Sequence, residues 1–587
     1  MTLFAKILAL LTPKEKKRGA LVMVMVIIMA CLETAGVASL MPFLSVLGNP
    51  EVVQTNPVLA TVYDTFGFQS VDSFLLALGI AAFTLIVFSA AFRTITYYAM
   101  NRFIEMRRHS ISKKLLETYL RQPYEFFLDR HSGDMAKSIL SEVDQLVQNV
   151  FRPGMKMVAY GVVALALIIL LIAVDPLISA GVAVVIGGTY GLIFLAVRGL
   201  LGRVGRRRRE ANRERFEAAG EALGGIKDIK LLGREHAYLK RFETPSTLQA
   251  SAQATNQTLA QVPKFAIEAV AFGGMIVLSV ALMVSHGGAG SDGLGNVLPI
   301  LGLYAFAGYK MLPAAQHVYT GMAKLRFGRA AVDGIHHDLV NRSNLAELHK
   351  KFSQALQPKN SIELRKLSYS YPNQEKYALH NINLTIPVGS SLGIIGPSGS
   401  GKTTLVDVVL GLLEPTHGEI VVDGEPLNGN SLRAWQNALG YVPQDIFLTD
   451  STVAENIALG VPPDQVDMAQ VQRCSQMAQL DDFISSEMID GYNTVVGERG
   501  VRLSGGQRQR IGVARALYHD PAVLVFDEAT SALDNETEAA LMEAVETLSK
   551  QKTVIMIAHR LSTIEKCDQI LTLSQGGLKN KRALVNE

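Results

Sequence analysis

GPSGSGKT, at residues 396–403, is the most specific pattern in this chain of 587 residues. It fits the phosphate-loop sequence G-x-x-x-x-G-K-[ST], in which a glycine-rich backbone closes around the phosphates of a nucleotide. The apolar run 392–395 before it predicts a buried strand, and the run 404–413 after it predicts a helix. We expect the Thr403 hydroxyl to bind Mg²⁺. The residues expected to bind the phosphates are Gly396, Ser398, Gly399, Gly401, Lys402, Thr403 and Thr404.

Further motifs follow the phosphate loop in a fixed order. They are YVPQ at 441–444, LSGGQ at 503–507, VLVFDE at 523–528, SALD at 531–534 and a histidine at 559. VLVFDE predicts a buried strand that ends in two carboxylates, where phosphoryl transfer needs a Mg²⁺ ligand and a residue that polarises water. Together the motifs resemble the nucleotide-binding domain of ABC ATPases over residues 361–580. LSGGQ is close to unique to that family.

The resemblance implies a role in hydrolysis for each matching residue. Asp527 is expected to bind Mg²⁺, and Glu528 is expected to act as general base on the attacking water. Gln444 is expected to contact both Mg²⁺ and the γ-phosphate. His559 is expected to contact the γ-phosphate and to position the water.

Two further implied roles concern the bound ATP. Tyr371 is expected to stack on adenine, the alternative being an ordinary strand tyrosine, because aromatic residues favour strands. Ser504, Gly506 and Gln507 are expected to bind ATP that is held mainly by a second subunit. The ATPase therefore needs two copies, and the intact motifs favour a homodimer. A heterodimer with a degenerate partner is the alternative.

The N-terminal half has the composition of a membrane domain. The whole chain is 49% hydrophobic and only 19% charged, which is too apolar for a wholly soluble protein of this length. A membrane-spanning helix needs ~20 apolar residues. Six stretches satisfy this requirement: 20–47, 73–101, 154–174, 177–199, 259–285 and 294–320. The third and fourth are separated only by Asp175 and Pro176, which predict a tight turn.

Basic residues predict how these spans are oriented. Lys and Arg are dense before the first span and in 102–152 and 198–264, but absent from 48–72, 175–176 and 286–293. The positive-inside rule then places both termini and the ATPase domain in the cytoplasm. No removable signal peptide is evident, and a bacterial inner membrane is the expected location. The net charge of only +3 argues against a nucleic-acid partner.

The predicted architecture is an all-α six-helix transmembrane domain with long cytoplasmic helical extensions, fused to an α/β P-loop ABC ATPase domain. We expect the transmembrane domain at 1–325, a linker at 326–360 and the nucleotide-binding domain at 361–587. The breaks at 123–129 and 225–231 resemble the coupling helices of ABC exporters. Phe126 and Phe127 in the first break suit such a contact, and closure of a local helical hairpin is the alternative.

Ionisable residues within the spans are the candidates for substrate binding, because such residues are costly in a membrane. Arg93, Lys264 and Lys310 are expected to line a basic interior suited to phosphate or pyrophosphate. The alternative is structural pairing, for instance Lys264 with Glu268 at helical i,i+4 spacing. A short amphipathic helix is expected within 57–66, on the outer membrane surface.

The first-span stretch 33–43, the predicted outer helix and Arg93 resemble the flippases that move lipid-linked oligosaccharides, whereas the lysines at the other two basic positions depart from that pattern. The resemblance implies an ATP-driven flippase for such a lipid or a related glycolipid, with ATP and Mg²⁺ as cofactors. A general lipid, peptide or drug exporter has the same layout, and so does an ATP-gated channel.

Overall fold

The computed structural model describes residues 2–128, 132–285, 291–340, 354–372, 374, 376–497, 500, 503–528, 543, 552–558 and 564–583. The chain divides into two compact units. Unit 1 is helical and comprises Met1–Leu120 and Ser132–Asn344. Unit 2 is α/β and comprises Leu345–Glu587 together with the short segment Arg121–His131. The predicted fold class is therefore confirmed.

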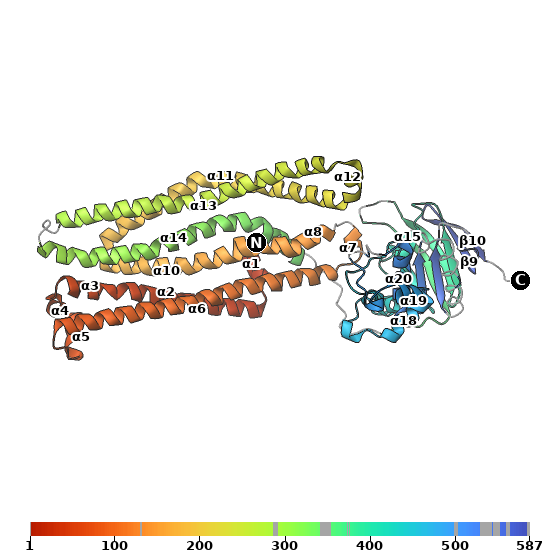
Figure 1. Cartoon of the computed structure of the whole chain (residues 1–587), viewed down its shortest axis with the longest axis horizontal. Helices are drawn as coiled ribbons and strands as arrows, with labels where there is room; N and C mark the ends of the chain where they lie inside the picture. Colours follow the sequence, from red (N-terminus) through yellow and green to blue (C-terminus); the bar gives the residue numbers. More distant parts are fainter. Residues whose placement is uncertain are drawn as a thin grey trace. The chain divides into compact units, whose positions relative to one another are not determined.

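Unit 1 is built from long helices with short connections (Figure 1). The principal helices are α2 (Pro13–Ala38), α3 (Leu40–Gly48), α6 (Val71–Leu120), α10 (Arg152–Val174), α11 (Pro176–Gly224), α13 (Glu235–Ser285) and α14 (Ser291–Val340). The shorter elements are α1 (Leu3–Leu10), α4 (Val52–Thr55), α5 (Pro57–Thr65), α8 (Ser132–Lys137), η1 (Ser138–Glu142), α9 (Val143–Leu146), η2 (Val147–Phe151) and α12 (Ile226–Leu232).

All six predicted spans lie on these long helices. Within the described chain, three segments are long and apolar enough to cross a membrane: Pro13–Gly48, Val71–Leu120 and Met135–Val174. The other three predicted spans lie on α11, α13 and α14, which contain 49, 51 and 50 residues. A helix of that length extends about 75 Å at ~1.5 Å per residue, whereas the hydrocarbon core of a bilayer is ~30 Å thick. Long extensions beyond the membrane follow from this difference.

The ends of the helices have local causes in the sequence. Thr12 and Glu15 form a capping box at the start of α2, which satisfies backbone N–H groups that have no partner within the helix. Asp175 interrupts α10 and α11, and its carboxylate accepts a hydrogen bond from the backbone N–H of Leu177 at 2.9 Å. Helix α14 continues to Val340, beyond the linker boundary predicted at 325, and Val332 and Ile335 are buried on this extension.

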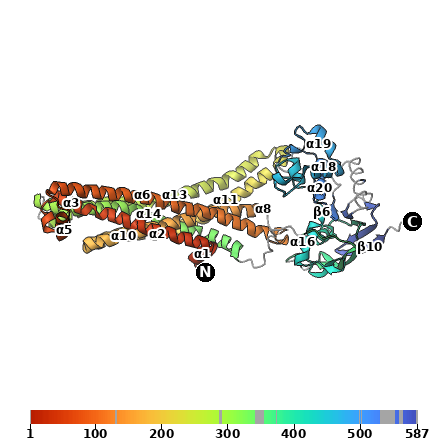
Figure 2. The same cartoon turned by 90° about the horizontal axis from the view of Figure 1, so that it is seen from below.

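Helices α10 and α14 pack along each other, and α11 packs along α13 as a hairpin closed by α12 (Figures 1 and 2). Leu167 and Leu171 of α10 share a buried cluster with Leu303 and Ala307 of α14. Because these residues pack against each other, the opposite faces of α10 and α14 point away from the apolar cluster.

Helix α5 lies where the short outer helix was predicted. Leu59 is buried, and the ring of Tyr63 packs edge to face on Phe74 at 5.3 Å. Val58 and Phe66 are 70% and 75% exposed. One face of α5 thus packs against the rest of unit 1, whereas Val58 and Phe66, the residue that follows the helix, are exposed.

The described residues of unit 2 form two sheets. A four-stranded antiparallel sheet has the order β2 (Leu379–Pro387), β1 (Ser361–Tyr369), β4 (His417–Val422) and β5 (Glu425–Pro426). A six-stranded sheet has the order β10 (Gly577–Ala583), β9 (Gln569–Ser574), β3 (Ser391–Ile395), β8 (Thr553–Ile557), β7 (Val523–Asp527) and β6 (Leu439–Val442). Strands β9, β3, β8, β7 and β6 are parallel, so their carboxyl ends meet at one edge.

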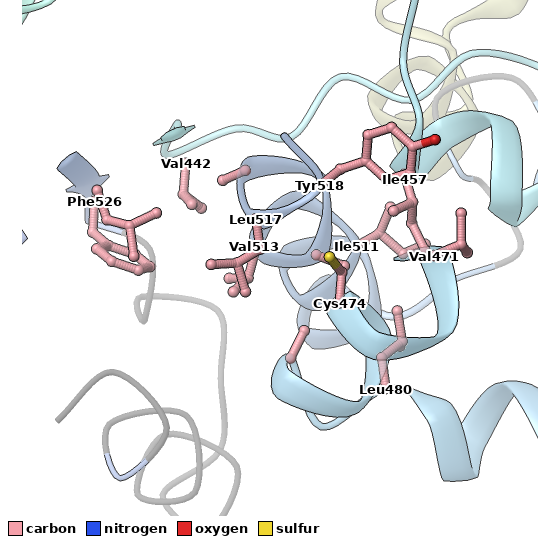
Figure 3. Close-up of a cluster of buried hydrophobic side chains, with 14 of the residues drawn as sticks. Val442, Ile457, Val471, Cys474, Leu480, Ile511, Val513, Leu517, Tyr518 and Phe526 are labelled. Atoms are coloured by element: carbon pink, nitrogen blue, oxygen red, sulfur yellow. The ribbon is translucent and has the colours of Figure 1, made fainter. Parts of the chain in front are cut away.

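Helices complete unit 2. They are α7 (Glu125–Leu128), α15 (Lys402–Val409), α16 (Gly429–Asn437), α17 (Val453–Ile457), α18 (Met468–Met477), α19 (Asp481–Glu487) and α20 (Gly505–Leu517), with single 3-10 turns at Pro463–Gln465 and Gly491–Asn493. Figure 3 shows one buried cluster, in which Val513 and Leu517 of α20 lie beside Val442 of β6 and Phe526 of β7. This cluster fixes α20 on the edge of the parallel sheet.

Candidate functional site

The phosphate loop connects β3 to α15, as predicted. A side chain at Gly396 would place its Cβ 2.3 Å from the carbonyl oxygen of Leu573. Gly401 has φ 101°, and a Cβ at this position would lie 2.7 Å from the carbonyl oxygen of Ala378. The ammonium group of Lys402 donates to the carbonyl oxygens of Gly396 and Pro397 at 2.8 and 3.1 Å. The loop therefore has the tight backbone that a phosphate cradle requires.

Within this loop Pro397 and the predicted phosphate ligands Ser398 and Gly399 are exposed, and Thr403 is exposed at the first turn of α15. The loop is open to a ligand at these positions. Thr404, by contrast, is buried.

Two predicted catalytic residues, Gln444 and Glu528, meet at the carboxyl ends of β6 and β7. These strands are parallel neighbours, with Val442 opposite Phe526, so Gln444 reaches the residues that follow β7. The Gln444 side-chain amide donates to the carboxylate of Glu528 at 2.8 Å. Glu528 has a left-handed backbone, with φ 51°, which is uncommon away from glycine and occurs at functional sites.

Asp527 is buried beside Glu528 at the end of β7. Burial raises the pKa of its carboxyl, and the negative charge of Glu528 raises it further. The hydrogen bond from the Tyr441 hydroxyl and the charge of Lys402 act in the opposite direction. A buried carboxylate next to a second one offers hard oxygen ligands of the kind that Mg²⁺ prefers, and the Thr403 hydroxyl and the Gln444 amide oxygen stay the other predicted ligands.

Asp407 was not among the site residues predicted from the sequence; it lies on α15 and is 8% exposed. Burial raises the pKa of its carboxyl to about 6, and the charge of Asp527 contributes. The signal in the sequence is one acidic residue inside an otherwise apolar helical run. Asp407 is therefore a third carboxyl group near Asp527, the predicted Mg²⁺ ligand, and Glu528.

Tyr371 lies close to the first turn of α15, next to the phosphate loop. Its hydroxyl lies 2.9 Å from the hydroxyl oxygen of Thr404, and its ring packs edge to face on Tyr369 at 5.1 Å. Tyr369 is buried and donates its hydroxyl hydrogen to the carboxylate of Glu125 at 2.9 Å. Stacking of Tyr371 on adenine stays a prediction.

The contact between Tyr369 and Glu125 explains why the segment Arg121–His131 belongs to unit 2. Phe126 and Phe127 pack edge to face at 5.3 Å and are half-buried. Helix α12, the second predicted coupling segment, is in unit 1 and leaves Ile226, Leu231 and Leu232 exposed. A cluster of exposed apolar side chains of this kind indicates an interaction surface.

The LSGGQ motif forms the start of α20. Ser504 and Gln507 make a capping box, in which the Ser504 hydroxyl accepts from the Gln507 N–H at 3.2 Å and the Gln507 amide oxygen accepts from the Ser504 N–H at 2.7 Å. Ser504 is exposed, and Gly506 follows in the first turn. An exposed helix N-terminus suits an anionic ligand. His559 and the SALD motif lie outside the described residues.

The structure brings together two of the three predicted substrate residues. Arg93 and Lys310 lie 3.2 and 3.8 Å from one carboxylate oxygen of Glu33, whose side chain is buried. Lys264 is not at this cluster and lies 3.8 Å from Glu268 on the same helix. Each of the three cations therefore has a carboxylate beside it, as the structural alternative anticipated.

Comparison with known proteins gives consistent matches over both units. Residues 379–531 match the family described as ABC transporter, and residues 39–288 match the family described as ABC transporter transmembrane region. An ATP-dependent lipid A-core flippase of Ralstonia nicotianae is 32% identical over 485 residues, which cover 80% of this chain and 77% of that protein.

Two further matches have other names. The heterocyst differentiation ATP-binding protein HepA of a Nostoc species is 31% identical over 476 residues, covering 79% of this chain and 74% of that protein. A solved structure of a bacterial Atm1-family ABC exporter with ATP bound covers 97% of this chain and 95% of its own, with a TM-score of 0.74 and 23% identity. This last similarity concerns the fold.

Proposed function

Because this chain belongs to the ABC transporter family, with a transmembrane region and an ATP-hydrolysing domain in one polypeptide, we propose that it is a flippase. Its substrate is a lipid-linked oligosaccharide or a related glycolipid, which it moves across a bacterial inner membrane. Both termini and the ATPase domain lie in the cytoplasm. The name of the Ralstonia relative, a lipid A-core flippase, supports the flippase class.

The proposed ATP hydrolysis is supported mainly by the hydrogen bond between Gln444 and Glu528. Glu528 is the base that accepts a proton from the attacking water, and Gln444 orients its carboxylate. Thr403, Gln444 and Asp527 would hold Mg²⁺. When bound, it neutralises charge on the phosphate oxygens. His559 positions the water.

Transport requires two copies of the chain, since Ser504 and Gly506 at the N-terminus of α20 bind the ATP held mainly by the other copy. ATP binds the closed pair more tightly than the open pair, and only this difference in affinity can shift the equilibrium toward closure. Hydrolysis removes the γ-phosphate and returns the pair to the open state. A homodimer then has two competent sites.

For the substrate, Arg93 and Lys310 surround a single carboxylate, so the cluster retains one excess positive charge. That charge favours a phosphate-bearing lipid; Lys264 lies outside this cluster, beside Glu268, and stays a separate candidate for substrate binding. A lysine ammonium lacks the bidentate geometry of arginine, which weakens selectivity for pyrophosphate. A general lipid, peptide or drug exporter is the second candidate, and the pairing of all three cations with carboxylates favours it.

Flipping in proteoliposomes tests the proposal. The purified chain is reconstituted with a fluorescent lipid-linked oligosaccharide, a fluorescent phospholipid or an amphipathic drug, and ATP-dependent translocation and ATPase stimulation are measured. We expect movement of the glycolipid. Stimulation and movement by drugs alone would contradict the flippase assignment and support the second candidate. The Glu528→Gln variant provides the control without hydrolysis.

A further inference from the structure

The loop that carries Gln444 has an irregular backbone. This Gln444 loop, residues 444–448, follows β6 and contains neither helix nor strand. Within the described part of the chain, no backbone group of the loop is hydrogen-bonded to another backbone group. Because the side-chain amide of Gln444 donates to Glu528 from this loop, neighbouring elements must hold the loop in place through side chains.

Helix α20, whose first turn carries the LSGGQ motif, packs against the Gln444 loop. A Cβ at Gly512 of α20 would collide with the side chain of Ile446, so the helix and the loop approach closely here. Leu448 belongs to the same buried cluster as Ile511 of α20, which is labelled in Figure 3. The loop therefore packs along the helix that is expected to bind the ATP of a second copy.

Arg515, near the end of α20, joins the Gln444 loop to α17. Its guanidinium group donates to the carbonyl oxygens of Phe447 at 2.9 Å and Asn456 at 2.8 Å, and to the side-chain oxygen of Asn456 at 3.5 Å. A guanidinium group is planar and holds its donors in a rigid fork. The three bonds therefore fix the position of Phe447, three residues after Gln444, relative to α17 and α20.

Asn456 extends this network to the residue that follows the loop. Its side chain is fully buried. The side-chain oxygen accepts from the backbone N–H of Thr449 at 3.0 Å, and the side-chain amide donates to the carbonyl oxygen of Thr449 at 3.1 Å. Arg515 and Asn456 thus hold the C-terminal end of the Gln444 loop, while β6 holds its N-terminal end.

The charge of Arg515 is not balanced by an ion pair. Among the described residues, no carboxylate lies within ion-pair distance of its guanidinium group, and burial lowers its pKa to about 10. The group is therefore charged at neutral pH. A partly buried charge is costly unless hydrogen bonds satisfy it. An apolar side chain would fill the same space at a lower cost, so the three oxygens that Arg515 joins are the reason for an arginine here.

We propose that Arg515 is a positioning residue for ATP hydrolysis. By joining Phe447 to Asn456 it holds the Gln444 loop against α20, and the loop then places the Gln444 amide beside Glu528. The inference rests on the proposed function, in which Gln444 orients the carboxylate of Glu528. Arg515 thereby connects the base of one ATP site to the helix that contributes to the ATP site of the second copy.

Kinetics and hydrogen exchange of the full-length chain in detergent test this role. In Arg515→Met we expect kcat for ATP hydrolysis to fall at least about tenfold, as misplacement of catalytic groups causes. The KM for ATP should change less than about twofold, since the phosphate loop is intact. Without nucleotide or Mg²⁺, hydrogen–deuterium exchange of the peptide 444–450 should become about tenfold faster, because hydrogen bonds to a charged group are lost.

Two further variants separate positioning from general support of the fold. Arg515→Lys keeps the charge but lacks the rigid fork, so it should retain the fold and recover only part of kcat. Arg510→Met is the matched control. Arg510 is a half-buried arginine of the same helix that donates to the carbonyl oxygen of Gln479 at 2.8 Å, away from the Gln444 loop. Its replacement should leave kcat and the exchange of 444–450 unchanged.

Unchanged exchange of 444–450 in both Arg515 variants would overturn the inference, and so would an equal loss of kcat in Arg510→Met. Gln444→Ala separates the inference from the proposed function. Loss of turnover in Gln444→Ala together with normal turnover in Arg515→Met would retain the role of Gln444 and refute the positioning role. Normal turnover in Gln444→Ala would refute the role of Gln444 and this inference together.

Discussion

Replacing Asp407 by asparagine should stabilise unit 2 at neutral pH. Asp407 lies on α15 between Val406 and Val408, which are both fully buried. Its pKa is raised from 3.8 to about 6, first by burial and then by the charge of Asp527. Since each pKa unit corresponds to ~1.36 kcal/mol, ionised Asp407 costs the folded state about 3 kcal/mol at pH 7 and above.

The sign of the pH dependence follows from proton binding. Between pH 3.8 and about 6 the folded chain binds more protons at Asp407 than the unfolded chain does. The free energy of unfolding therefore falls as pH rises through this window and stays low above it. The advantage of Asp407→Asn should be close to its full value at pH 7.5 and smaller at pH 5.

The assay is calorimetric unfolding of the full-length chain in detergent without nucleotide or Mg²⁺, following the transition of the ATPase domain. Asp423→Asn provides a control of opposite sign. Burial opposes ionisation of Asp423, but hydrogen bonds from the backbone N–H groups of Asn360, Lys359 and Ser361 lower its pKa overall. Asp423→Asn should therefore destabilise the domain, more at pH 7.5 than at pH 3.5. An Asp407→Asn variant that is less stable than the parent at pH 7.5 would refute the burial argument.

Three further variants test the ATP site and its connection to the segment Arg121–His131. Glu528→Gln should retain ATP binding and lose about 10²–10⁴-fold in turnover, as removal of a positioned base does; near-normal ATPase activity would exclude this role. Lys402→Ala should weaken binding of a fluorescent ATP analogue, and unchanged affinity would argue against the phosphate cradle. Tyr369→Phe removes the hydrogen bond to the half-buried Glu125, worth about 1 kcal/mol. It should reduce substrate-stimulated ATPase about fivefold while basal ATPase persists, and equal loss of both activities would indicate a merely structural contact.

The sequence predicted the arrangement of the phosphate loop, Gln444 and Glu528 because this arrangement follows from the order of parallel strands. Once β3, β6 and β7 lie in one sheet, their carboxyl ends meet, and the phosphate loop, Gln444 and Glu528 come together. Asp407 escaped notice because its importance depends on burial against Asp527, which no local pattern reveals.

The ion pairs of unit 1 depend on tertiary packing even more strongly than Asp407 does. Costly charges in predicted spans identify residues that matter, but they do not reveal which cations share a carboxylate. Glu33 on α2 binds Arg93 of α6 and Lys310 of α14, residues 60 and 277 positions away in the sequence, so this cluster depends on how three helices pack.

The segment Arg121–His131 has a similar dependence on tertiary structure. It interrupts the long helices of unit 1 but belongs by its contacts to unit 2. Glu125 accepts a hydrogen bond from Tyr369, Tyr369 packs on Tyr371, and the Tyr371 hydroxyl contacts Thr404 beside the Mg²⁺ ligand expected at Thr403. Packed side chains therefore connect Thr404, next to the phosphate loop, with Glu125 in the segment Arg121–His131. Proximity alone does not establish energetic coupling. A double-mutant cycle that combines Tyr369→Phe with Tyr371→Phe measures it directly, and additive effects on stimulated ATPase would show that the two tyrosines act independently.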